Sequence, residues 1–189
     1  MRMHPRLAEL FTYIDQEHDA LRSAYEAVPA DRRAMRPSPE TWSVDDVIGH
    51  LTLIERRLAT VLGNVIAQAR AGGLPNESAS DSVLERINAG RWSDRSMKFK
   101  GPAVVDPRTA EIVYSWSDYD ETRRRLKDVL LGGDGLALEQ VSHPHVIMGP
   151  LSIYEWIGFM GGHAARHAAQ IREIAATLTS DVTPDAPRD

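Results

Sequence analysis

Four long stretches of this 189-residue chain repeat apolar residues at the three- and four-residue spacing of an α-helix. They cover approximately residues 7–28, 43–72, 106–132 and 152–178. Each stretch carries one apolar stripe, which is stable in water only when it is buried against another element. Because strand signals are few, the pattern predicts an all-α protein, a four-helix bundle.

Short polar motifs indicate where three of these helices begin. Ser43 and Asp46 have the three-residue spacing of a capping box, and so do Ser152 and Glu155. In a capping box the two side chains satisfy backbone N–H groups that the first helical turn leaves without partners. The pair Asp106–Pro107 predicts an N-cap followed by proline at the first helical position, and therefore the start of the third helix.

The connection between the second and third helices is long, which predicts a chain that crosses over the bundle. Within it we expect one short helix in residues 80–92 and an extended segment at 97–107. The Pro-containing segment 141–150 is expected to be a loop. Residues 1–180 are expected to form one domain, and 181–189 a disordered tail.

Charge and composition exclude several classes of function. The formal net charge is −5, and no basic cluster is dense enough to follow a phosphate backbone, so we expect no nucleic-acid partner. There is no cysteine, which excludes disulfides, thiolate metal ligands and a cysteine nucleophile. No stretch approaches the ~20 apolar residues that span a bilayer, and the N-terminus lacks an apolar run resembling a signal peptide. We therefore expect a cytoplasmic protein without membrane attachment.

Two histidines one helical turn apart, His163 and His167, lie within the apolar stripe of the fourth helix. Buried imidazoles need partners, which a shared metal ion would provide; two separately satisfied core histidines are the alternative. His50 lies at the edge of the stripe of the second helix. If the two helices bring these three rings together, the site has three protein ligands and positions open to water, as catalytic metal sites do.

Two segments resemble the DinB/YfiT-like superfamily of metal-binding four-helix bundles. They are WSVDDVIGHL at 42–51 and HPHVIMGPLSIYEWIGFMGGHAARHAAQI at 143–171, and the crossover FKGPAVVDP at 99–107 resembles the proline-containing link of that family. The resemblance covers nearly the whole chain. It implies a divalent metal held by His50, His163 and His167, and a homodimer, since relatives commonly pair through bundle faces.

The resemblance leaves the reaction open. Members include transferases that use bacillithiol or mycothiol, a maleylpyruvate isomerase branch, proposed hydrolases and proteins of unknown activity. Zinc, nickel, iron and manganese all suit imidazole ligands. Such a metal would lower the pKa of a bound water, or hold a low-molecular-weight thiol as thiolate. We expect a thiol S-transferase or hydrolase acting on a small-molecule substrate. The alternatives are a non-catalytic, stress-related metal- or ligand-binding bundle and a plain structural bundle.

Two further residues are candidates for catalysis. His18 lies on the inward stripe of the first helix, where it would be an acid/base group or a structural histidine. Arg123 follows Trp116 and Tyr119 at helical spacing and would receive an anionic substrate at a pocket mouth. Aromatic residues at this spacing also occur in ordinary helix cores, so a core role is the alternative for this group.

Other residues near the predicted site have mainly structural interpretations. His143 and His145 flank a proline and are interpreted as structural or pocket-rim residues. Trp42 is interpreted as an apolar staple at a helix start. Gln170 would form a hydrogen bond near the site or lie at a helix interface. Three glycines in the fourth helix, Gly158, Gly161 and Gly162, predict a neighbouring helix or a ligand at close range, because glycine is otherwise unfavourable there.

Overall fold

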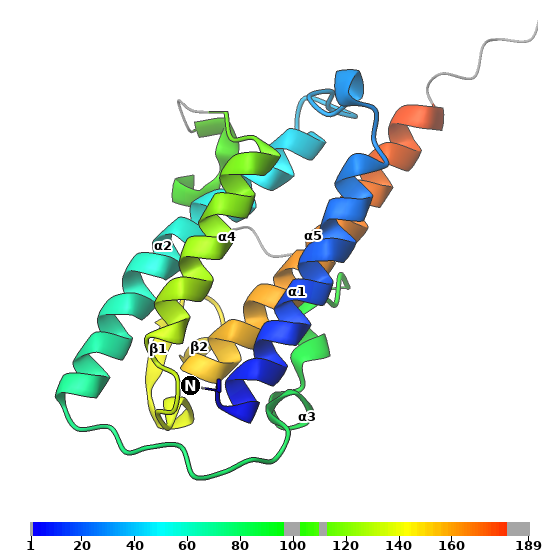
Figure 1. Ribbon diagram of the computed structural model, residues 1–189. Helices are drawn as coiled ribbons and strands as arrows, with labels where there is room; N and C mark the ends of the chain where they lie inside the picture. The colour runs from blue at the N-terminus through cyan, green and yellow to red at the C-terminus, as the bar shows by residue number, and fades with distance from the viewer. Residues whose placement is uncertain (1, 97–102, 110–112, 181–189) are drawn as a thin grey trace, which may run out of the picture.

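The computed structural model describes residues 2–96, 103–109 and 113–180 and is mostly helical (Figure 1). The four long helices are α1 (Pro5–Glu26), α2 (Val44–Ala71), α4 (Trp116–Leu131) and α5 (Ile153–Ser180). They run side by side, with the most extensive contacts between α1 and α5 and between α2 and α4. The predicted all-α four-helix bundle is therefore confirmed. None of the helices in the described part of the chain has the length and apolarity to span a bilayer.

The apolar stripes meet in two clusters along the bundle. Leu58 of α2 and Leu126 of α4 belong to one cluster, and Leu51 of α2 and Tyr119 of α4 belong to the other. Burial of such side chains supplies most of the driving force for folding. Between these positions each of the two helices has one buried charged residue, Glu55 in α2 and Arg123 in α4.

The two predicted capping boxes are present, but the predicted start of the third helix is wrong. The backbone N–H of Asp46 donates to Ser43 Oγ at 3.0 Å, and that of Glu155 donates to Ser152 Oγ at 3.2 Å. The chain does not enter the helix at Asp106–Pro107. Residues Pro107–Thr109 form a short 3₁₀ turn (η4), and α4 begins at Trp116 after a further capping box. The Asp106 carboxylate instead accepts from the backbone and side chain of Arg108.

The segment expected to be a loop at 141–150 forms most of a β-hairpin. Strands β1 (Ser142–His145) and β2 (Gly149–Ser152) pair antiparallel, with Pro144 opposite Pro150. Prolines argue against a strand in a sheet interior, but a two-stranded hairpin consists only of edge strands, where proline is tolerated. Gly149, with φ of +76°, adopts the left-handed conformation that the turn into β2 requires.

The long crossover passes across the end of the bundle and returns along α1 and α5 (Figure 1). The short helix predicted in 80–92 is present as α3 (Val83–Ile87), followed by a 3₁₀ turn, η2 (Ala89–Trp92). The segment expected to be extended at 97–107 instead contains a 3₁₀ turn, η3 (Ala103–Val105), before η4. Its residues 97–102 lie outside the described ranges, as does the tail 181–189.

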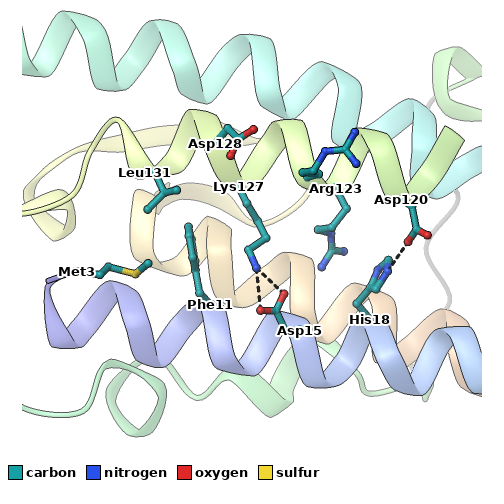
Figure 2. Close-up of a pocket in the computed structure, with 10 residues that line it drawn as sticks. Met3, Phe11, Asp15, His18, Asp120, Arg123, Lys127, Asp128 and Leu131 are labelled. Atoms are coloured by element: carbon teal, nitrogen blue, oxygen red, sulfur yellow. Dashed lines mark hydrogen bonds and ion pairs between the residues drawn. The ribbon is translucent and has the colours of Figure 1, made fainter. Parts of the chain in front are cut away.

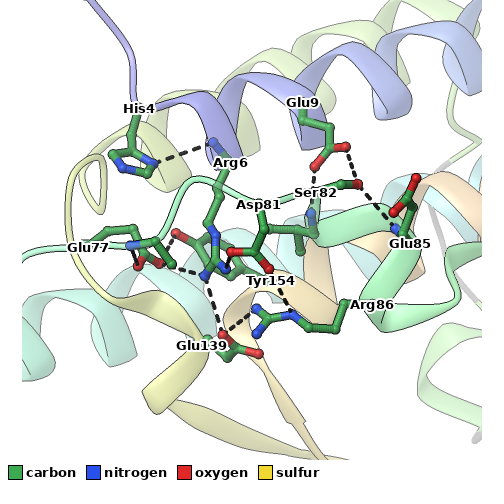
Figure 3. A network of polar contacts seen from close by, with 12 residues as sticks. His4, Arg6, Glu9, Glu77, Asp81, Ser82, Glu85, Arg86, Glu139 and Tyr154 are labelled. Atoms are coloured by element: carbon green, nitrogen blue, oxygen red, sulfur yellow. Dashed lines mark hydrogen bonds and ion pairs between the residues drawn. The ribbon is translucent and has the colours of Figure 1, made fainter.

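A network of polar contacts holds the crossover against the bundle (Figure 3). Arg6 of α1, whose side chain is 2% exposed, donates to the Glu77 carboxylate at 3.2 Å, and the Tyr154 hydroxyl of α5 donates to the same carboxylate at 3.1 Å. Glu9 accepts from the Ser82 hydroxyl at 2.6 Å and so holds the start of α3. Hydrogen bonds to charged groups are stronger than neutral ones, so these contacts tie residues 77–82 firmly to α1 and α5.

The glycines of α5 lie where neighbouring segments approach closely. A Cβ atom on Gly162 would lie 2.7 Å from Trp92 Cβ and 3.1 Å from the Ala89 carbonyl oxygen. A Cβ atom on Gly161 would overlap the Tyr13 ring of α1. The prediction of a close neighbour is confirmed, and the close packing brings Trp92 next to the part of α5 that carries the histidines.

Candidate metal centre

The structure brings His50, His163 and His167 together at the contact between α2 and α5. One nitrogen from each ring can be chosen so that all lie within 4.8 Å of one another. The Nε2 atoms of His163 and His167 are 3.0 Å apart, and the His50 ring centroid lies 5.4 Å and 5.0 Å from those two rings. Convergence of three imidazoles from two helices matches the ligand set of an open metal site.

Carbonyl oxygens orient two of the three rings. His50 Nδ1–H donates to the Val105 carbonyl at 2.7 Å, and His167 Nδ1–H donates to Gln170 Oε1 at 2.8 Å. A neutral imidazole with its proton on Nδ1 has its lone pair on Nε2, so both Nε2 atoms are ready to bind a cation. Metal-binding histidines commonly have such a partner on the second nitrogen. The donor set therefore fits a divalent metal.

Local sequence explains how Val105 reaches His50. The turns η3 and η4 pack against α2, and Gly49 lies at the contact with η4. A Cβ atom on Gly49 would lie 3.1 Å from Pro107 Cβ, tighter than nine in ten Cβ contacts in proteins. Glycine beside His50 thus allows the backbone of residues 103–107 to approach and to place the Val105 carbonyl at the Nδ1 edge of the ring.

Burial keeps the three imidazoles neutral. Desolvation lowers the pKa of His163 and of His167 well below the ordinary value for histidine. The neighbouring His167 lowers the pKa of His163 further, and His50 does the same for His167. Desolvation also lowers the pKa of His50, against the opposing effect of its hydrogen bond to the Val105 carbonyl. Neutral imidazole is the form that binds metals.

Aromatic rings enclose the histidines. The Trp42 ring centroid lies 4.7 Å from that of His50, and Phe159 stacks on His163 at 5.0 Å with an interplanar angle of 19°. The interpretation of Trp42 only as a helix-start staple therefore missed its contact with the site. Phe159 was not identified either, although it precedes His163 by one helical turn, a spacing that predicts contact.

A cavity of about 610 Å³ opens beside the histidine cluster. Its lining includes aromatic side chains, the turn of the β-hairpin and three arginines. The residues in these groups are Trp42, Trp92, Phe159, Val146, Ile147, Met148, Arg91, Arg95 and Arg166. A concave, mostly apolar cavity with a few convergent polar groups is typical of small-molecule sites.

His145 lies at the rim of this cavity, while the described lining does not include His143. His145 Nδ1 accepts from the backbone N–H groups of Ile147 at 3.1 Å and Met148 at 3.3 Å, and so shapes the hairpin turn. The backbone carbonyl of His143 accepts from Trp156 Nε1 at 3.1 Å. These contacts agree with the structural and pocket-rim interpretation of the two residues.

The structure places His18 and Arg123 away from the histidine cluster. Both line a second cavity, about 440 Å³, between α1 and α4 (Figure 2). None of its described lining residues also lines the cavity of the histidines. His18 Nε2 lies 2.7 Å from Asp120 Oδ1, and Arg123 is engaged by the buried carboxylate of Glu55. The anionic-substrate role expected for Arg123 is therefore not at the candidate metal centre.

The structure is a four-helix bundle whose second long helix carries one histidine of the cluster and whose last carries two. This arrangement is the one expected of a metal-binding four-helix bundle. The chain belongs to the DinB superfamily, whose family model matches residues 13–171. It is also similar to the uncharacterized protein YuaE of Bacillus subtilis (strain 168), with 28% identity over 141 residues. That alignment covers 74% of this chain and 80% of the relative. No solved structure matches the chain significantly.

Proposed function

We propose that the protein binds a divalent metal through His50, His163 and His167 and acts on a small molecule as a metal-dependent thiol S-transferase or hydrolase. The observation that carries the proposal is the convergence of the three rings, two of which hold their lone pair on Nε2 because carbonyl oxygens accept from Nδ1–H. The adjoining cavity of about 610 Å³ has room for a small substrate.

The residues of the chain would act by orienting and enclosing the site. Val105 and Gln170 hold the tautomers of His50 and His167, while Trp42 and Phe159 limit access of water to the rings. A divalent metal here would be a Lewis acid that lowers the pKa of water or of a thiol. Zinc, nickel and iron suit imidazole ligands, while manganese prefers oxygen ligands. Because the chain has no cysteine, a reacting thiol would come from a low-molecular-weight cofactor.

One observation favours a second candidate, a non-catalytic metal- or ligand-binding protein. The two residues considered as catalytic groups, His18 and Arg123, line the other cavity. If no other group moves a proton at the site, the centre would bind a ligand without turning it over. The two candidates share the same histidines and differ in whether a product forms.

Metal content is the first test of both candidates. We expect about one equivalent of a divalent metal per chain in untagged, full-length protein purified without chelator and analysed by elemental mass spectrometry. Absence of metal, even after reconstitution with zinc, nickel, iron and manganese, would overturn the proposal. With stoichiometric metal, product in thiol-transfer or ester-hydrolysis assays supports an enzyme, whereas persistent inactivity supports the binding protein.

Gln170 provides a test that leaves all three histidines in place. Gln170→Leu removes the acceptor for His167 Nδ1–H while keeping a side chain of similar size. We expect zinc affinity to fall about 10- to 100-fold, the usual effect of removing a partner of a metal-binding histidine. Gln170→Glu retains an acceptor oxygen and is expected to bind zinc at least as tightly as Gln170→Leu does. Competition with a chromophoric chelator measures the affinities, and an unchanged affinity in Gln170→Leu would contradict the assigned role.

A further inference from the structure

Three arginines line the same cavity as the candidate metal ligands, and two of them are held together. Arg95 Nη1 donates to the backbone carbonyl of Arg166 at 3.4 Å, and Arg166 donates to the backbone carbonyl of Asp94. The Arg95 side chain also pairs with Glu173 of α5, its Nε lying 2.8 Å from Oε1. These reciprocal bonds between the crossover and α5 fix two guanidinium groups at the cavity wall.

The close placement of the two cations favours a negative ligand. Both guanidinium groups line the cavity, and that of Arg95 lies against the backbone of Arg166. A bound anion would relieve the repulsion between the two guanidinium groups, whose planar N–H donors match the two oxygens of a carboxylate.

Along α5, the part of the cavity lined by Arg95 and Arg166 is separated from a part lined by apolar side chains. Phe159, His163 and Arg166 all line the cavity and follow one another along the helix. With a rise of about 1.5 Å per residue, Phe159 and Arg166 are about 10 Å apart along the axis, and His163 lies between them. The Phe159 end also meets the hairpin, since the His145 ring centroid is 4.9 Å from that of Phe159.

The hairpin turn adds exposed apolar surface to that end of the cavity. Val146 is 78% exposed, Ile147 47% and Met148 37%. All three line the cavity beside Phe159. Exposed apolar side chains gathered at the edge of a cavity are typical of a ligand-binding surface.

We propose that the ligand of this cavity is an elongated organic carboxylate with an apolar group at its other end. The apolar group would lie against the hairpin turn and Phe159, and the carboxylate would bind Arg95 and Arg166. The reacting atom would then lie between them, at the histidine cluster. This inference rests on the proposed function in that it assigns the substrate to the cavity of the candidate metal centre.

A matched pair of probes tests the inference on the full chain. The probes are 6-phenylhexanoate and its neutral amide, 6-phenylhexanamide, titrated calorimetrically into protein before and after metal is removed with a chelator. We expect the carboxylate to bind at least about tenfold more tightly than the amide in metal-free protein, because the arginines pair with the carboxylate and outweigh the opposing charges of Glu40 and Asp94 in the same lining. Equal binding of the two probes in metal-free protein would overturn the inference.

Variants test whether these two arginines, and not other cations, cause the preference for the carboxylate. Combining Arg95→Gln with Arg166→Gln is expected to abolish the preference for the carboxylate over the amide. Arg172→Gln, at an exposed position of the same helix, is the matched control and should retain the preference. Glu173→Gln removes the carboxylate that pairs with Arg95, and this variant should bind the carboxylate probe more tightly. A preference that survives the double arginine replacement, or that Glu173→Gln fails to strengthen, contradicts the proposal.

The metal-free arm keeps this test distinct from the test of metal binding. If the protein binds no metal, the preference for the carboxylate is still measurable and the inference stands without the proposed chemistry. If the preference exists only in metal-loaded protein, the carboxylate binds the metal, so the arginine assignment is wrong while the metal centre stands.

Discussion

Replacing His163 by alanine is expected to lower the affinity of the protein for zinc by at least about 100-fold. Loss of a partner to a metal-binding histidine alone costs 10- to 100-fold, and removal of a ligand costs more. His163 lies in the middle of the site, with its Nε2 atom 3.0 Å from that of His167 and its ring stacked on Phe159. Competition with a chromophoric chelator measures the affinity, and elemental mass spectrometry measures the metal retained on purification.

The matched control for this variant is His143→Ala. His143 lies in the hairpin near the cavity, but it is its backbone carbonyl that accepts from Trp156, and alanine preserves that bond. We expect His143→Ala to bind zinc like the parent and His163→Ala to keep a cooperative thermal transition. Equal zinc affinity in the parent and in folded His163→Ala would show that the metal binds elsewhere and would remove the basis of the proposed function.

The helices and the three clustered histidines could be predicted from sequence because both depend on local periodicity. Apolar stripes with a period of 3.6 residues identify the faces that meet in the core. His163 and His167 share one of those faces, since four residues separate them, and His50 lies at the edge of another. Two capping boxes likewise use residues only three positions apart.

The features that sequence did not reveal depend on tertiary contacts or on competing local signals. The acceptor for His50 is the backbone carbonyl of Val105, and any residue type supplies a carbonyl. The motif Asp106–Pro107 and the pair Ser115–Asp118 both offer a helix start, and the chain uses the second. His18 does face inward as its stripe indicates, yet periodicity does not determine which residues lie opposite it across the bundle.

The buried ion pair between α2 and α4 leads to the other prediction with a large expected effect. Glu55 and Arg123 have side chains that are 3% and 4% exposed, and Arg123 Nε donates to Glu55 Oε2 at 2.8 Å. The Tyr119 hydroxyl donates to Glu55 Oε1 at 3.1 Å, and Arg123 Nη1 donates to the Ile14 carbonyl at 3.3 Å. This polar cluster lies between the two apolar clusters of the bundle.

Glu55→Ala is expected to lower the free energy of unfolding by about 3–5 kcal/mol, measured by urea denaturation. Burial acts to lower the pKa of Arg123, but the charge of Glu55 and the bonds to Glu55 and Tyr119 raise it above its ordinary value. Without Glu55 the guanidinium remains in the core as a charge with no compensating carboxylate. A loss below about 1 kcal/mol, typical of an exposed pair, would contradict this account.

Removing both charges distinguishes a stabilising pair from one that is only costly to break. We expect the double variant Glu55→Leu with Arg123→Met to recover most of the stability lost in Glu55→Ala, because apolar replacements of a buried pair avoid its desolvation cost. The described residues that line the cavity of the histidines include neither Glu55 nor Arg123. Zinc affinity should therefore match the parent in the folded double variant, and a weakened affinity would show that the ion pair helps to position α2 at the metal centre.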